Sequence, residues 1–150
     1  MLWNQHTLLD RMVLEAPLAR LDPTPLKGAP LLTFLVTEDL TAPAGSYSGP
    51  LTLLVALQNQ KLQGVTARNP TGVVEPIHLS LTGKSAWKKV FDGAAEGFLS
   101  LHCQMQEEDF VVQYERFWPT STGWKVNSRT ERGFWEADAE FPAEALFPPK

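Results

Sequence analysis

The sequence is poor in cysteine and has no long apolar run. Its single cysteine, Cys103, excludes an intramolecular disulfide and a metal site built only from cysteines. No stretch approaches the ~20 apolar residues that a membrane-spanning helix requires. The segment MLWNQHTLLDRMVLEA lacks the basic start and the unbroken apolar run of a secretory signal. We therefore expect a soluble cytoplasmic protein and no contact with a membrane.

Basic side chains are also scarce. Thirteen Lys and Arg residues stand against seventeen Asp and Glu residues, which gives a net charge of −4. Proteins that bind phosphate backbones usually carry a basic stripe, so nucleic acid is not the expected partner. The length of 150 residues suits a single domain, 1–150, that buries roughly 70% of the surface of its unfolded chain.

Recognisable catalytic and cofactor motifs are missing. Gly83, Lys84 and Ser85 resemble the end of a phosphate-binding loop, but that loop needs a glycine where His78 stands. No His-x-His or His-x-x-x-His spacing indicates a metal site. We expect no cofactor and no metal.

Hydrophobic spacing predicts two helices. In residues 2–20 the apolar positions recur near a period of 3.6, and Pro17 ends or kinks the helix. In residues 85–96, Ser85 suits an N-cap, and the apolar side chains that follow it fit one helical face. Both helices are expected to pack on a sheet.

Strands are predicted in the rest of the chain. The segments are 31–37, 51–57, 62–68, 73–82 and a three-stranded meander over 98–141. We predict an α+β fold, in which a mostly antiparallel, curved or half-closed sheet of six to seven strands is covered by the two helices. The alternative is a closed β-barrel with flanking helices. Residues 41–50, rich in Pro, Gly and Ser, are interpreted as a surface loop, with a lid as the alternative.

The segment YERFWPTSTGWKV, residues 114–126, suggests an aromatic hairpin. It resembles the closing hairpin of domains in the nuclear transport factor 2-like superfamily. The resemblance covers about a dozen residues and implies only helices packed on a curved sheet. No functional residue is carried over from it.

Polar candidates for chemistry lie on the predicted strands. His78 and His102 each fall on the polar face of a strand, and Glu115 or Glu131 could supply a carboxylate for general acid–base catalysis. Ordinary surface histidines are the alternative. Cys103 and its neighbour His102 point to opposite faces, so they cannot form a nucleophile pair with each other.

Aromatic candidates for binding lie in the second half of the meander. Tyr114, Arg116 and Trp118 share one strand face, and Trp124 follows the next turn. Aromatic side chains with a few polar groups are typical of small-molecule sites, so these four residues are candidate ligand-binding residues. The alternatives are stacking of nucleic-acid bases, or cross-strand packing with Arg116 neutralised by a carboxylate.

The sequence does not identify a function. Our first hypothesis is a non-catalytic domain that uses an aromatic-lined sheet face to bind a small apolar or aromatic ligand or a protein partner, a second copy included. The alternatives are a small enzyme with a His and carboxylate site, and a single-stranded nucleic-acid binder.

Overall fold

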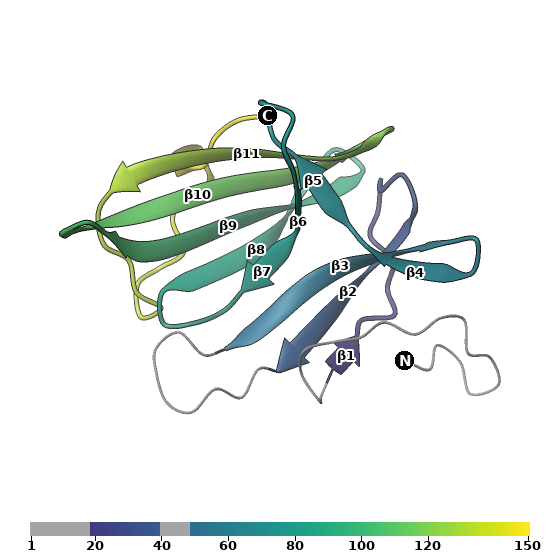
Figure 1. Cartoon of the computed structure of the whole chain (residues 1–150), viewed down its shortest axis with the longest axis horizontal. Coiled ribbons are helices and arrows are strands. Elements are labelled where there is room, and N and C mark those ends of the chain that lie inside the picture. Colours follow the sequence, from purple (N-terminus) through teal and green to yellow (C-terminus); the bar gives the residue numbers. More distant parts are fainter. Residues whose placement is uncertain (1–18, 40–48) are drawn as a thin grey trace.

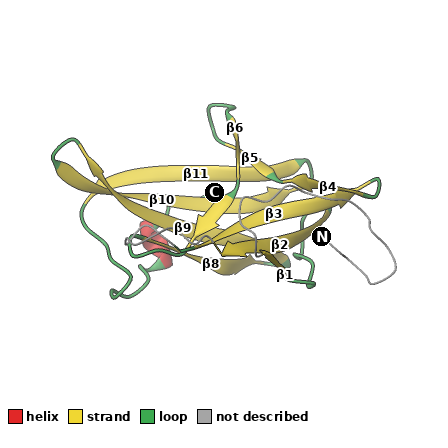
Figure 2. Cartoon of the chain, turned by 60° about the horizontal axis from the view of Figure 1, so that its bottom comes forward, coloured by secondary structure: helices red, strands yellow, loops and turns green. Residues whose placement is uncertain are grey.

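The computed structural model describes residues 19–39 and 49–150 (Figure 1). Within these ranges the chain forms eleven strands and one 3-10 turn, η1 (Glu144–Leu146), and no α-helix (Figure 2). The α+β prediction is therefore wrong, and so is its barrel alternative with flanking helices. Most of the helix predicted over 2–20 and the loop predicted over 41–50 lie outside the described residues, but Ala19–Leu21 form a strand.

The strands form two sheets. The first sheet contains β1 (Ala19–Leu21), β2 (Leu32–Asp39), β3 (Pro50–Gln58), β4 (Lys61–Gly64) and β7 (His78–Ser80). The second contains β5 (Thr66–Arg68), β6 (Val74–Pro76), β8 (Ser85–Asp92), β9 (Ala95–Gln106), β10 (Asp109–Thr120) and β11 (Gly123–Arg132). All pairs are antiparallel except β5 with β11, which is parallel.

Two broken strands join the sheets. β3 pairs with β4 at one end and with β7 at the other, along the same side. After β4 the chain bends at Val65 and continues as β5 in the second sheet, while β6 bends at Ile77 and continues as β7 in the first. The Ile77 amide donates to the Val65 carbonyl oxygen at 3.2 Å, so the bends are in contact. The sequence segments 62–68 and 73–82 were each predicted as one strand, and this change of sheet explains why each is two.

The second predicted helix is a hairpin. Residues 85–96 fall in β8, a turn and the start of β9. Trp87 packs on the core between the sheets, whereas Ala86 and Val90 pack on the opposite face. These positions fit a strand with two apolar faces as well as they fit a helix, so spacing alone misleads. Asp92-Gly93, with a φ of 61° at Gly93, is the hairpin signal that the helical interpretation overlooks.

The antiparallel meander predicted from residue 98 is present as β9, β10 and β11. Its third strand ends at Arg132, earlier than the predicted end at residue 141. Gly133 follows with a φ of 153°, and the chain then leaves the sheet. Residues 133–150 turn back across the face of the second sheet that is opposite the first sheet.

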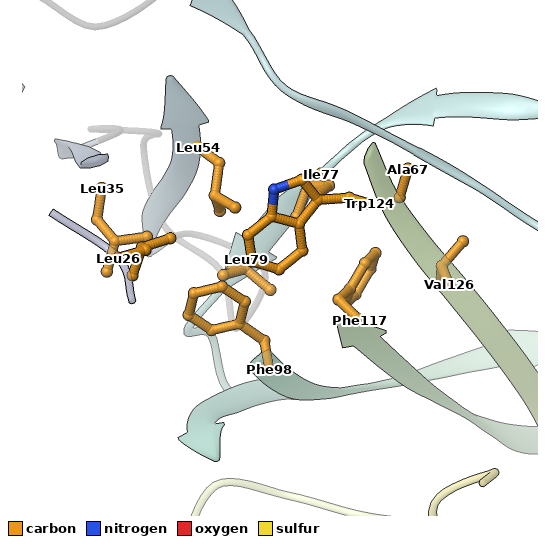
Figure 3. Close-up of a cluster of buried hydrophobic side chains, with 10 residues drawn as sticks. All are labelled: Leu26, Leu35, Leu54, Ala67, Ile77, Leu79, Phe98, Phe117, Trp124 and Val126. Carbon is orange, nitrogen blue, oxygen red and sulfur yellow. The ribbon is translucent and has the colours of Figure 1, made fainter. Parts of the chain in front are cut away.

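Two apolar clusters position the functional surfaces. The cluster between the sheets contains Leu26, Leu35, Leu54, Ala67, Ile77, Leu79, Phe98, Phe117, Trp124 and Val126 (Figure 3). The cluster between the second sheet and the C-terminal segment contains Leu99, Leu101, Cys103, Val112, Tyr114, Trp135 and Phe147. The second sheet is thus covered on both faces. Within the described ranges, no helix has the length and apolar character needed to cross a membrane.

Candidate functional site

An open cleft of about 390 Å³ lies between the first sheet and the turn that joins β10 to β11. One wall comes from β2, β3 and β4, and the other from residues 121–124. The lining residues are Pro30, Leu31, Thr33, Ala56, Gln63, Gly64, Val65, Thr66, Ser121, Thr122, Gly123 and Trp124. Apolar surface therefore alternates with hydroxyl and amide groups, as in many small-molecule sites.

Trp124 is a buried lining residue of this cleft, with 4% of its surface exposed. Its indole reaches from β11 towards Leu54 on β3, with the nitrogen on that side (Figure 3). The indole N–H has no hydrogen-bond partner among the described residues. A buried donor without a partner lowers the stability of the fold by roughly 1–3 kcal/mol. An acceptor that bonded to this N–H would recover that free energy.

The cleft continues towards positive charge. A neighbouring hollow of about 140 Å³ shares Trp124 and Thr66 with it and adds Arg68 and Lys125. A third hollow, of about 340 Å³, shares Arg68 and Lys125 with the second and is also lined by Lys150, whose ammonium pairs with Asp92. The parallel pairing of β5 with β11 places Arg68 directly opposite Lys125. The groove formed by these hollows is therefore apolar at one end and cationic at the other.

The structure separates the four aromatic-face candidates. Tyr114, Arg116 and Trp118 lie on the face of β10 towards the C-terminal segment. Trp124 lies opposite Pro119, on the other face, in the core between the sheets. The short turn sets this parity, because directly paired residues of antiparallel strands share a face.

The chain's own C-terminal segment covers two of the outer three, Tyr114 and Arg116. The rings of Tyr114 and Phe147 meet edge to face with centroids 5.2 Å apart. Arg116 donates to the Pro148 carbonyl oxygen at 2.7 Å and forms an ion pair with Glu144 at 3.0 Å. Burial raises the pKa of the Tyr114 hydroxyl, and Glu131 adds to this effect.

Two of the acid–base candidates come together. His78 and Glu115 line a hollow of about 200 Å³ with Glu75, above the apolar side chains of Phe117 and Val126. Burial raises the pKa of the Glu115 carboxyl, and Glu75 raises it further, while a hydrogen bond from Ser128 at 3.3 Å opposes the shift. A carboxyl of this kind can act as a proton donor at a higher pH than an exposed one.

His102 does not line that hollow. Its strand, β9, belongs to the second sheet, whereas the strand of His78 belongs to the first. His102 pairs with Gln113 and Ser85, and lies diagonal to Glu115 on the same face of the sheet. Cys103 points to the other face and is fully buried. No group of three His, Cys, Asp or Glu side chains in the described residues is arranged to hold a metal ion.

Most residues that line the cleft were not predicted from the sequence as site residues. Thr33, Gln63 and Thr66 come from three different strands, and only the bend after β4 brings them to the turn at Ser121. No local pattern marks these residues. Gly64 gave a partial signal, because a glycine inside a strand predicts a break or bulge at the point where the chain changes sheets.

Comparison with known proteins adds no relative. No family model, curated protein or solved structure gives a significant match to this chain.

Proposed function

We propose that the protein is a binding domain for a small amphipathic molecule, held in the cleft beside Trp124. The ligand would place an apolar body against Leu31, Val65 and the indole. An anionic or acceptor group would extend towards Arg68 and Lys125. Of the four aromatic-face candidates, only Trp124 would contact this ligand. The other three lie on the outer face of the second sheet, away from the cleft.

The observation that carries the proposal is the buried, unpartnered indole N–H of Trp124. Most buried polar groups have partners, so an exception calls for an explanation. The indole nitrogen of Trp87 is also buried and has no hydrogen-bond partner among the described residues. Trp87, however, lines none of the hollows that form the cleft. Of these two tryptophans, only Trp124 lines the cleft.

The polar side chains that line the cleft also suit an amphipathic ligand with an anionic or acceptor group. Thr33 is almost fully buried, and its hydroxyl donates to the Leu31 carbonyl oxygen at 2.8 Å, which leaves its lone pairs as acceptors. Gln63 and Thr122 are exposed at the rim. Lys125 forms no ion pair within the described part of the chain. A carboxylate with an alkyl or aromatic body fits this distribution.

The test compares two probes and three variants, Trp124→Phe, Trp87→Phe and Lys125→Ala. Octanoate and 1-octanol share an apolar chain, but only octanoate carries a negative charge. A ligand that prefers the native state raises the melting temperature. We expect octanoate to raise the melting temperature more than 1-octanol. Trp124→Phe, which keeps a ring and removes the N–H, should reduce this shift, and the matched control Trp87→Phe should not.

Other outcomes of these measurements would contradict the proposal. If neither probe shifts the melting temperature, the cleft does not bind this class of molecule. If Trp124→Phe responds like the unmodified chain, the indole N–H does not bind the ligand. If only Lys125→Ala reduces the octanoate shift, the cationic end binds anions without the indole, and the role assigned to Trp124 is wrong.

A small enzyme is the second candidate. It is favoured by Glu115, whose raised pKa and position beside His78 suit a general acid. Hydrolysis of a panel of p-nitrophenyl esters and glycosides would test it. The enzyme hypothesis predicts a rate above background that falls by about 10²-fold or more in Glu115→Gln. Equal rates for the two proteins would remove this candidate.

A further inference from the structure

The C-terminal segment, residues 141–150, packs on the outer face of the second sheet without joining it as a strand. No backbone hydrogen bond joins this segment to a strand in the described structure. Its three proline residues, Pro142, Pro148 and Pro149, have no N–H to offer a sheet ladder. The segment must therefore be held through its carbonyl oxygens and its side chains.

Three side chains from two adjacent strands supply the donors. Arg129 donates to the Leu146 carbonyl oxygen, Arg116 to that of Pro148 at 2.7 Å, and Asn127 to that of Pro149 at 2.6 Å. These donors contact main-chain atoms, which every peptide offers. They fix the direction and register of the segment without selecting its sequence.

An aromatic pocket supplies the selectivity. Phe147 is 4% exposed and contacts Tyr114 of the groove edge to face, and within the segment its ring is stacked on Phe141 at 5.4 Å. Its backbone, with φ −84° and ψ 149°, is close to the polyproline II conformation. Two prolines then follow, the second of them exposed. Extended proline-containing segments bind aromatic grooves in this conformation because little entropy is lost on docking.

Charges at both ends match the segment. Glu144 pairs with Arg116 before the aromatic residue, and Lys150 pairs with Asp92 after the prolines. The groove thus contacts an acidic residue, an aromatic residue, two prolines and a cation in order. The contacts come from β8, β9, β10 and β11, and the segment adds no strand to the sheet.

We infer that this face is a peptide-recognition groove, occupied here by the chain's own segment, that takes an extended aromatic-Pro-Pro-cation segment of a partner protein. Residues 138–140 connect the segment to the rest of the chain without a backbone hydrogen bond to a strand, so exchange of the segment leaves every ladder of the sheet intact. The attached segment competes at an effective concentration of about 1 mM, which masks the groove in the unmodified chain.

The probe is a fluorescent synthetic peptide with the sequence of residues 141–150, FPAEALFPPK. Phe147→Ala weakens the attached segment and leaves the groove unchanged. We expect the peptide to bind this variant at least about tenfold more tightly than the unmodified chain, because the internal competitor is weaker. Phe134→Ala is the matched control. Phe134 is 54% exposed and lies in the same covering region, outside the segment, so its loss should leave peptide binding unchanged.

A second form of the protein covers the case in which Phe147→Ala does not fold. A protease site inserted after Asp138, in an exposed stretch, allows the folded full chain to be cut. The cut segment should remain bound and then exchange with the labelled peptide, as followed by native mass spectrometry. A control peptide with alanine in place of the aromatic residue before the two prolines should not exchange.

Three results would overturn the inference. One is a folded Phe147→Ala variant that does not bind the peptide. Another is a cut protein that loses its own segment and takes up neither peptide. The third is a dimer of the unmodified chain, seen by light scattering, that Phe147→Ala abolishes, because the occupant would then be a second copy and not a separate partner.

Discussion

The rings of Phe98 and Trp124 are stacked, with centroids 5.8 Å apart and an interplanar angle of 24°. Phe98 is fully buried on β9, and it also contacts Trp87 edge to face at 5.8 Å. The indole that lines the cleft is therefore held in place by the core. A ligand in the cleft would meet a fixed floor, which reduces the entropy lost on binding.

Phe98→Ala should strongly destabilise the fold. Removal of a fully buried ring leaves a cavity beside Trp124 and costs about 3–5 kcal/mol of unfolding free energy. Urea denaturation measures this loss. Phe91→Ala is the control on the partner strand of the same hairpin, because Phe91 is 67% exposed, and its change should stay within about 0.5 kcal/mol. Equal losses in the two variants would show that the core is placed wrongly.

Gly97→Ala should destabilise the protein through a backbone clash. A Cβ at Gly97 would lie 2.5 Å from the carbonyl oxygen of Phe117, on the adjacent strand β10. Relief of such a clash requires the strands to move, at a cost of about 1–3 kcal/mol. Gly64→Ala is the matched control, since a Cβ there meets no atom within 4 Å, and it should be neutral or slightly stabilising. A melting temperature that falls equally in both variants would contradict this account.

Arg116→Ala should loosen the C-terminal segment. The Arg116 side chain is 13% exposed and donates to the Pro148 carbonyl oxygen, so its loss removes a largely buried charged hydrogen bond worth about 1.5–3 kcal/mol. Glu144→Gln removes only the exposed ion-pair partner and should cost under about 1 kcal/mol. Hydrogen exchange at the Phe147 amide would be faster in the first variant than in the second. The reverse order would show that the ion pair, and not the carbonyl contact, holds the segment.

Glu115→Gln should stabilise the protein more at pH 7 than at pH 4. The pKa of Glu115 is raised in the folded state, so the native protein binds this proton more tightly than the unfolded chain does. The resulting stability is complete below the ordinary carboxyl pKa of about 4.3 and is lost as the pH rises through the folded pKa. Glutamine has no such loss and can still accept the hydrogen bond from Ser128.

Other ionisable groups lie near Glu115. Glu75 and His78 line the same hollow, and His102 lies diagonally across the sheet. Both proteins retain them, so the difference between the two stability curves isolates Glu115. A difference that is larger at pH 4 than at pH 7 would contradict the sign of the pKa shift.

The sequence predicted the parts of the fold that depend on local alternation. Strands β9, β10 and β11 follow from turn signals and from the alternation of apolar and polar residues, which also places Cys103 and His102 on opposite faces. The helix prediction for 85–96 was wrong because β8 carries apolar side chains on both faces, so its sequence lacks the alternation that distinguishes a strand from a helix. The Asp92-Gly93 pair was the stronger local signal.

The candidate site could be predicted only in part. Tyr114, Arg116 and Trp118 do share a face, but the sequence could not show that residues 141–150 fold back to cover it. Such a contact depends on packing between segments far apart in the chain. The cleft beside Trp124 depends on the change of sheet after β4, which is likewise a tertiary feature.

The most direct test of ligand binding follows the Trp124 indole N–H by nuclear magnetic resonance. Each of the five tryptophans gives one indole N–H signal, and Trp124→Phe and Trp87→Phe assign the signals of the two buried, unpartnered indole nitrogens in the described residues. Addition of octanoate should shift the Trp124 signal downfield, because a new acceptor bonds to it, and leave the Trp87 signal in place. An unchanged Trp124 signal at octanoate concentrations that raise the melting temperature would contradict the claim that this indole binds the ligand.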